Sequence, residues 1–408
     1  MNTGTEHYLR GNSADTAKEK TELLAALASG EVLFPLEIMG MGVDFTTQEL
    51  VVEGLREGVI ASLTAVGSGY NDIRDQLGSI PNFKDRVALS HRANAEALLK
   101  KIAYVRERQP NRIFGVNLMR AVSDYENLLQ VIGKSEQVDL LFVGAGIARD
   151  LPEKMTAYPW MHYVPIISSA RVAAMFVAQA KKNDNRSPLA FYVELPTKAG
   201  GHLGAKDAED ALDAEKFDPQ KLLEEIQKAA PGIPLILGGG ITHSQHIEAA
   251  HAMGYSGAGI GTRALLTQES GLSNNLIINH YLNPDAKIVT GMTSPAGLPS
   301  RFVENPAFDN TIAHQIRRAI VARCVSCIGA ERCQFLAGNT PYCIAESLSA
   351  TRRGEPDGLL FTGSELGVLR NDDLYKGENG ELRVPTLAEA LAFTLDPRNV
   401  PQTDSSKG

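Results

Sequence analysis

The sequence predicts an α/β fold, a (β/α)8 TIM barrel with a C-terminal cysteine-containing extension. Eight short runs rich in Val, Ile, Leu and Phe recur along the chain. The runs are continuously apolar rather than alternating, as in parallel strands that are buried on both faces. Stretches with helical periodicity separate the runs without a break in composition. A doubly wound sheet is the alternative, because only the strand count separates the two folds.

The eight expected strands follow one another at fairly regular spacing. In order they are VLFPLEIMG, VIASLTAVG, IFGVNLM, VDLLFVGAG, YVPIISSA, PLAFYVEL, IPLILGGG and SGAGIGTRA, beginning at Val32, Val59, Ile113, Val138, Tyr163, Pro188, Ile233 and Ser256.

Amphipathic segments between the runs predict the helices of the barrel. They are TTQELVVEGLREG, DYENLLQVIGKS, ARVAAMFVAQAKK, PQKLLEEIQKAA and SQHIEAAHAMG. Gly232 and Gly254 stand where turn glycines and helix-ending glycines are expected. The longest spacing, between the second and third runs, contains a further helical stretch, SHRANAEALLKKIAYVRER. We expect this excursion to cover the site.

The chain divides into five expected segments. Residues 1–30 form a polar, helical arm, and residues 31–270 form the barrel. Residues 271–350 form a lid or substrate region that carries four cysteines. Residues 351–395 contain a final helix, TLAEALAFTL, and residues 396–408 form a disordered tail.

The charge and the hydropathy of the sequence limit the classes of binding partner and the cellular location that we expect for the protein. The 408 residues include 40 Lys and Arg against 48 Asp and Glu, a net charge of −8, without a run of basic residues. This composition argues against a nucleic-acid partner. The sequence lacks an apolar window of about 18 residues and an apolar core near its N-terminus, which predicts no membrane segment and no signal peptide. We therefore expect a cytoplasmic protein that acts on small molecules.

Glycine-rich loops end the last two expected strands. Gly239 and Gly240 follow the seventh strand, and Gly259, Gly261 and Thr262 close the eighth. TIM barrels place their active sites at the carboxyl ends of the strands, and often bind a phosphate after strands seven and eight. Glycine lets backbone amides approach such a phosphate closely. The loops therefore predict a phosphate site, with ordinary strand-to-helix turns as the alternative.

The motif AGGHLG directly follows the sixth expected strand. Gly200 and Gly201 allow the backbone to approach a flat ring, and His202 is the imidazole in this context. A histidine at a strand end can act as an acid, a base or a hydrogen-bond donor near neutral pH. We take His202 as the candidate catalytic residue; the alternative is a structural histidine.

Together, these motifs resemble the nitronate monooxygenase family, also called 2-nitropropane dioxygenase-like. The family shares an FMN-binding barrel with a class of flavin-dependent enoyl-acyl-carrier-protein reductases. The matching segments, in family order, are MGMGV, FGVNLM, VDLLFVGAGIARDLPE, VPIISSARVA, KAGGHLG, LGGGI, GIGTRAL and SPAGLPSR.

The resemblance implies FMN as cofactor and His202 as the active-site histidine. It also implies two sets of FMN contacts, to the phosphate from Gly239, Gly240, Gly261 and Thr262, and to the ring or ribityl chain from Met41, Gly42, Asn117, Gly200 and Gly201. Two positions depart from the family. Gly259 stands where many members have Gln, and Glu194 replaces a Gln ahead of the GGH motif. Both residues remain in the expected FMN site, where Glu194, as a carboxylate near the flavin, would only accept hydrogen bonds.

Three functions remain open from the resemblance. The first is a monooxygenase that oxidises a nitronate to a carbonyl compound and nitrite. The second is an enoyl-thioester reductase that uses NAD(P)H or an iron–sulfur electron path. The third is a flavin-binding subunit that depends on a partner. The substrate would be a small molecule or an acyl thioester, and a homodimer is compatible with each function.

All four cysteines of the chain lie within one short segment. Cys324, Cys327, Cys333 and Cys343 have the spacing C-x2-C-x5-C-x9-C. In a cytoplasmic chain, such thiols favour metal ligation over disulfides. Four thiolates suit either Zn(II) or a [4Fe-4S] cluster, and the uneven spacing favours the cluster. Unligated cysteines are the alternative. The segment also resembles a cysteine-bearing branch of the family.

Overall fold

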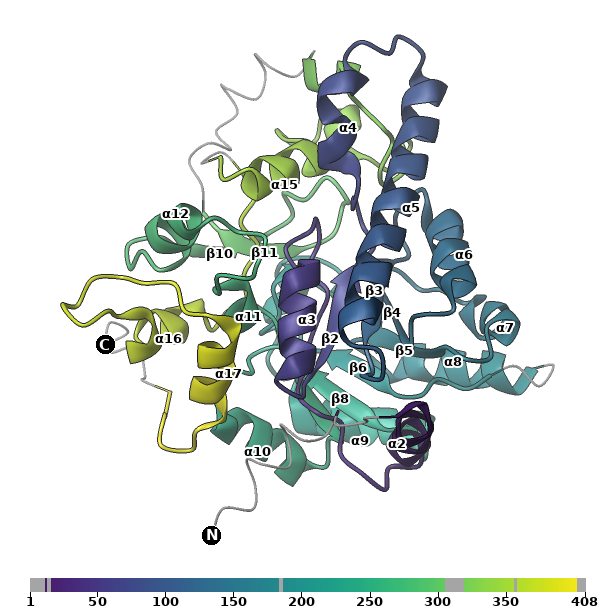
Figure 1. Ribbon diagram of the computed structural model, residues 1–408, viewed down its shortest axis with the longest axis vertical. Helices are drawn as coiled ribbons and strands as arrows, with labels where there is room; N and C mark the ends of the chain where they lie inside the picture. Colours follow the sequence, from purple (N-terminus) through teal and green to yellow (C-terminus); the bar gives the residue numbers. More distant parts are fainter. Residues whose placement is uncertain (1–11, 13–15, 183–185, 305–318, 356–357, 402–408) are drawn as a thin grey trace.

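Eight parallel strands close into a barrel in a computed structural model of the chain, which describes residues 12, 16–182, 186–304, 319–355 and 358–401 (Figure 1). Each strand pairs with its neighbours in chain order, and the last pairs with the first, Glu37 opposite Gly259. The barrel strands are β1 (Glu37–Ile38), β2 (Ile60–Thr64), β3 (Gly115–Met119), β4 (Leu140–Gly144), β5 (His162–Ile167), β6 (Phe191–Glu194), β8 (Leu235–Gly238) and β9 (Gly257–Ile260).

The TIM barrel predicted from the sequence is confirmed, and each of the eight apolar runs overlaps one barrel strand. The first run is nine residues long, yet β1 has only two residues. Pro35 has no N–H to give to a strand ladder, and the chain leaves the barrel wall at Gly40. An apolar run therefore marks the place of a strand better than it marks the strand's length.

Helices cover the outside of the barrel (Figure 1). Side-chain caps begin several of them; for example, Thr47 accepts from the Leu50 amide at the start of α3, and Asp218 accepts from the Lys221 amide at the start of α9. The helices around the barrel are α3 (Gln48–Arg56), α5 (Phe83–Arg108), α6 (Tyr125–Ser135), α7 (Leu151–Lys154), α8 (Ala170–Lys181), α9 (Pro219–Ala229), α10 (Ser244–Met253) and α11 (Thr262–Leu265), whereas α4 (Tyr70–Leu77) packs against α5 and against α15 (Ile344–Arg352) of the later chain.

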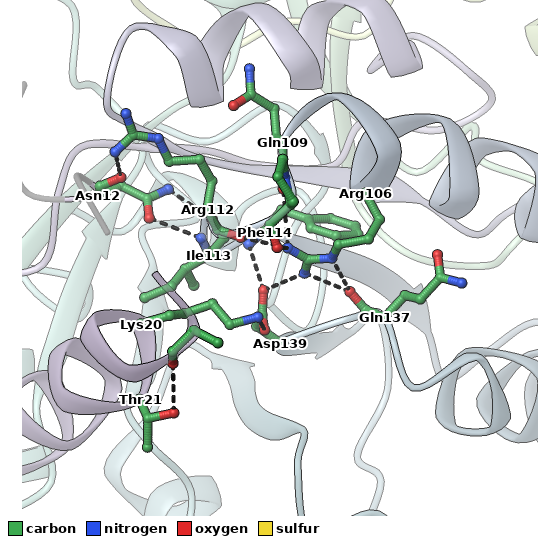
Figure 2. A network of polar contacts seen from close by, with 12 residues as sticks. Asn12, Lys20, Thr21, Arg106, Gln109, Arg112, Ile113, Phe114, Gln137 and Asp139 are labelled. Atoms are coloured by element: carbon green, nitrogen blue, oxygen red, sulfur yellow. Dashed lines mark hydrogen bonds and ion pairs between the residues drawn. The ribbon is translucent and has the colours of Figure 1, made fainter. Parts of the chain in front are cut away.

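The N-terminal helix α2 (Ala17–Ser29) closes the amino-terminal end of the barrel. Leu24 and Leu27 belong to the apolar cluster of the barrel interior. Figure 2 shows the polar contacts around this end, where Asp139 accepts from Lys20 at 2.8 Å and from Arg106 at 2.7 Å. The arm expected at residues 1–30 therefore includes a helix that seals the base of the barrel.

The chain after the barrel builds a second core beside it. A three-stranded antiparallel sheet joins β10 (Ile288–Gly291), β11 (Ser300–Val303) and β7 (Gly201–His202), the last coming from the loop after β6. The short helices of this part are α12 (Asn274–Leu276), α14 (Gln334–Ala337), α15 (Ile344–Arg352) and α16 (Leu366–Arg370), and α17 (Leu387–Leu395) returns to pack against α3.

The expected disordered tail, 396–408, lies outside the described residues from 402 onward. Among the helices that the structure describes, none combines the length and the apolar character needed to cross a membrane.

Candidate functional site

A cavity of about 300 Å³ lies at the carboxyl ends of the barrel strands. It is the place where TIM barrels bind their ligands. All twelve residues assigned from the sequence to the cofactor and to catalysis line this cavity: Met41, Gly42, Asn117, Glu194, Gly200, Gly201, His202, Gly239, Gly240, Gly259, Gly261 and Thr262. The structure brings them together, and their binding of FMN stays a prediction.

The loop after β8 has the conformation expected of a phosphate-binding turn. Gly239 and Gly240 have φ angles of +100° and +81°, which favour glycine. A Cβ on Gly239 would lie 3.0 Å from the Ala199 nitrogen. Within the described residues, the amides of Gly239, Gly240 and Gly261 donate to no protein acceptor. These donors, on two neighbouring strand ends, fit the phosphate of FMN.

Thr262 and Gly200 hold a segment from the far end of the chain against the cavity. The Thr262 hydroxyl accepts from the Gly363 amide at 3.0 Å. A Cβ on Gly200 would lie 2.3 Å from the carbonyl carbon of Thr362, so only glycine allows this approach. Residues 361–363 and Glu365 therefore line the cavity. No motif in the sequence indicated this contribution.

Asn117 and Gly259 line the cavity, and contacts with other residues of the protein account for the presence of an amide at the first position and of a glycine at the second. The Asn117 amide donates to the Gly40 carbonyl at 3.0 Å, which holds the Gly40–Gly42 loop against β3. A Cβ on Gly259 would lie 2.2 Å from the phenol oxygen of Tyr192. The Tyr192 ring thus fills the space where a larger side chain, such as the family's Gln, would begin.

His202 is held in a rigid and uncharged setting. It pairs with Ser300 through β7, and its ring lies edge-on to Phe361 with the centroids 5.3 Å apart. Its Nε2 lies 2.6 Å from the Ser294 hydroxyl. Burial lowers the pKa of His202 to about 4. At neutral pH the ring is therefore neutral and can act as a hydrogen-bonding group.

Glu194 ends β6 and faces the same cavity. Burial raises the pKa of its carboxyl to about 7, against smaller lowering effects of the Gly204 amide and of Arg301. In its ionised form this side chain only accepts hydrogen bonds, and in its protonated form, which the raised pKa favours, it can also donate one.

The outer end of the cavity is formed by the chain that follows β2, including α5, and by the cysteine segment. The long helix α5 contributes Ser90, His91 and Asn94, so the expected excursion does cover the site. Asn94 donates to Asp124 at 2.8 Å. Apolar side chains complete this end, among them Val122, Val325, Ile328, Ile344 and Leu348.

A buried charge cluster lies behind the two glycine loops. Arg263, next to Thr262, donates to Asp372 at 2.5 Å and to the Thr242 carbonyl at 3.0 Å. His243 lies 3.3 Å from the other oxygen of the Asp372 carboxylate. All three charged or ionisable side chains are almost fully buried. The cluster joins the C-terminal segment to the loops after β8 and β9.

The metal centre predicted for the four cysteines is not supported. All four are free thiols around a small cavity of about 20 Å³, room for about one water molecule. Among the residues that the structure describes, no group of three or more His, Cys, Asp or Glu side chains is arranged to hold a metal ion. Burial raises the pKa of the Cys324, Cys327 and Cys343 thiols, which favours the protonated form. Cys327 also lines the outer end of the main cavity.

Comparisons with solved structures find the same fold at low sequence identity. FabK from Thermotoga maritima is 18% identical, with 91% of this chain and 94% of that chain covered and a TM-score of 0.57. Nitroalkane oxidase from Streptomyces ansochromogenes is 17% identical, with 90% and 96% covered and a TM-score of 0.59. The enoyl reductase domain of MlnA from Bacillus amyloliquefaciens is 12% identical, with 91% and 95% covered and a TM-score of 0.61.

No protein of curated function matches the chain. The family model described as nitronate monooxygenase matches residues 25–376, which include the barrel, the GGH motif and the cysteine segment. With this match over most of its length, the chain belongs to the nitronate monooxygenase family of oxidoreductases.

Proposed function

We propose that the chain is an FMN-dependent oxidoreductase that oxidises a nitronate to a carbonyl compound and nitrite. One observation carries the proposal. The cavity combines, among the described residues, glycine amides that donate no hydrogen bond to the protein with a neutral His202 on its wall. The amides of Gly239, Gly240 and Gly261 would hold the phosphate. FMN, when bound, supplies the electron transfer that amino-acid side chains cannot.

His202 would bind the nitro group through its free ring nitrogen. Ser294 accepts from the Ala296 amide at 3.2 Å, which leaves its hydroxyl hydrogen to donate to Nε2 of His202. With this arrangement the ring hydrogen of His202 would lie on Nδ1, the nitrogen that does not contact Ser294. This N–H can orient a nitronate oxygen and stabilise its negative charge.

A second candidate is the reduction of an enoyl thioester with NAD(P)H. The apolar outer end of the cavity favours it, because a small nitronate would leave that end empty whereas an acyl chain would fill it. A flavin-binding subunit that needs a partner is the third candidate, and a homodimer stays a prediction. The cysteine cavity takes no part in the proposed reaction.

The absorption spectrum and two turnover assays test the proposal. We expect the purified protein to show the visible bands of oxidised flavin. Oxygen consumption with a nitronate should exceed NAD(P)H oxidation with an enoyl thioester. The reverse order would select the reductase, and inactivity with both would leave the partner-dependent subunit. A protein that binds no flavin, even when FMN is added, contradicts all three.

Replacing His202 by alanine should lower turnover by at least about tenfold, because the donor to the substrate oxygen is lost. His202→Gln should recover part of the rate, since its amide also donates. The measurement is the rate of the assay that proves active, with FMN saturating. His280→Ala, outside the cavity, is the matched control. An unchanged rate in His202→Ala rejects the assigned role.

A further inference from the structure

Lys198 lines the same end of the cavity as the glycine amides of the loop after β8. We propose that Lys198 binds the phosphate of FMN together with these amides, and that its ion pair with Glu365 keeps the ammonium group beside the glycine loop. The inference rests on the proposed function, because it adds a side chain to the FMN site proposed there.

The side chain of Lys198 runs along the loop after β8. A Cβ on Gly240 would lie 3.3 Å from its Cγ and 3.5 Å from its Cδ, and a Cβ on Gly239 would lie 3.3 Å from its Cβ. The backbone of Lys198 is fixed on both sides, because its N–H donates to the Leu195 carbonyl at 3.0 Å and its carbonyl accepts from the Ser364 amide at 3.0 Å. The stem therefore starts at a fixed point and follows the backbone whose amides would bind the phosphate.

The C-terminal segment holds the ammonium group of Lys198. Its Nζ donates to Oε1 of Glu365 at 2.7 Å, and the same oxygen accepts from the Ser364 hydroxyl at 3.1 Å. Glu365 also lines the cavity. A lysine ammonium has three N–H donors. The bond to one carboxylate oxygen therefore leaves donors for a phosphate next to it.

The other cation of the cavity lining is committed elsewhere. Among the described lining residues, Lys198 and Arg263 are the lysine and arginine side chains. Arg263 is almost fully buried and donates to Asp372 and to the Thr242 carbonyl. The Lys198 side chain is 47% exposed and can turn toward a ligand. A phosphate monoester carries a charge of about −1.5 to −2 at neutral pH, which a lysine offsets as a point charge.

The affinities of the apoprotein for FMN and for riboflavin test the assignment, because riboflavin lacks only the phosphate. Flavin fluorescence during titration gives both dissociation constants. Lys198→Met keeps an unbranched apolar stem on the glycine loop and removes the charge. We expect this variant to raise the dissociation constant for FMN by about tenfold and to leave that for riboflavin within about twofold.

Lys216→Met is the matched control. Lys216 also forms an ion pair, with Asp210 at 2.5 Å, and its side chain is 49% exposed, but it lies outside the cavity lining. The control should change neither dissociation constant, because the lost charge is not next to the phosphate position.

Glu365→Gln should act in the opposite direction. The amide oxygen still accepts from Lys198 and from Ser364, whereas the negative charge that repels a phosphate is removed. We expect FMN to bind about threefold more tightly and riboflavin to bind as before. Weaker binding of both flavins would show that Glu365 only holds the C-terminal segment in place, and would overturn the role assigned to it.

Two results in Lys198→Met overturn the inference. An equal loss for FMN and riboflavin means that the lysine only supports the loop. An unchanged affinity for FMN means that the glycine amides bind the phosphate without it, and the proposed function then stands alone. If the unsubstituted protein binds neither flavin, the proposed function fails, and the inference fails with it.

Discussion

Replacing Asp372 by alanine should lower the free energy of unfolding by about 3–5 kcal/mol, the usual cost of removing one partner from a buried ion pair. Arg263 and His243 both contact this carboxylate and are fully buried. Without it, the Arg263 guanidinium stays buried with its charge uncompensated. Urea denaturation of the variant and of the unsubstituted protein, followed by circular dichroism, measures the difference.

The neighbouring residue provides the control for this prediction. Asp373 is exposed and pairs with Lys376 at the surface. Asp373→Ala should therefore change the free energy of unfolding by less than about 1 kcal/mol. Equal losses in the two variants would show that the buried cluster does not stabilise the fold. Asp372→Asn should fall between the two, because an amide keeps a hydrogen-bond acceptor for Arg263 and removes the charge.

Replacing Gly239 by alanine should weaken FMN binding by at least tenfold, about 1.4 kcal/mol. The residue has a φ of +100°, and its Cβ would lie 3.0 Å from the Ala199 nitrogen. To relieve the backbone strain and the close contact, the loop has to change its backbone conformation. This change moves the amides of Gly239 and Gly240 away from the expected phosphate position. Titration of the apoprotein with FMN, followed by flavin fluorescence, measures the dissociation constant.

Gly254 separates this effect from simple backbone strain. It ends α10 with a φ of +111°, and a Cβ there would meet only Leu223, at 3.7 Å. Gly254→Ala should cost about 1–2 kcal/mol of stability for the same kind of strain and leave the dissociation constant for FMN unchanged. If both variants bind FMN as the unsubstituted protein does, the loop after β8 is not the phosphate site.

Continuous apolar runs predicted the barrel well, because both faces of each strand are buried and the pattern is local. The glycine loops and the GGH motif were found for a similar reason: the chemistry lies within a few consecutive residues at strand ends. The sequence therefore predicted the residues that line the cavity at the ends of the barrel strands.

Contacts between distant segments could not be predicted in this way. Ser294 reaches His202, and Thr362 reaches Gly200, only because the extension folds back over the barrel. The raised pKa of Glu194 could not be predicted either, since it comes from burial of the carboxyl in the folded chain, which outweighs the opposing effects of the Gly204 amide and of Arg301. The cysteine spacing suggested a metal centre, but spacing along the chain does not fix how side chains converge in space.

The hydrogen bond between Thr262 and Gly363 joins two segments that are synthesised at different times. Synthesis from the N-terminus completes all eight barrel strands by Ile260, whereas the segment that closes the cavity follows about a hundred residues later. Domains fold as they emerge from the ribosome. A nascent chain therefore has its barrel strands before it has the segment around Gly363, so the lining of the cavity is complete only once that segment has been released from the ribosome.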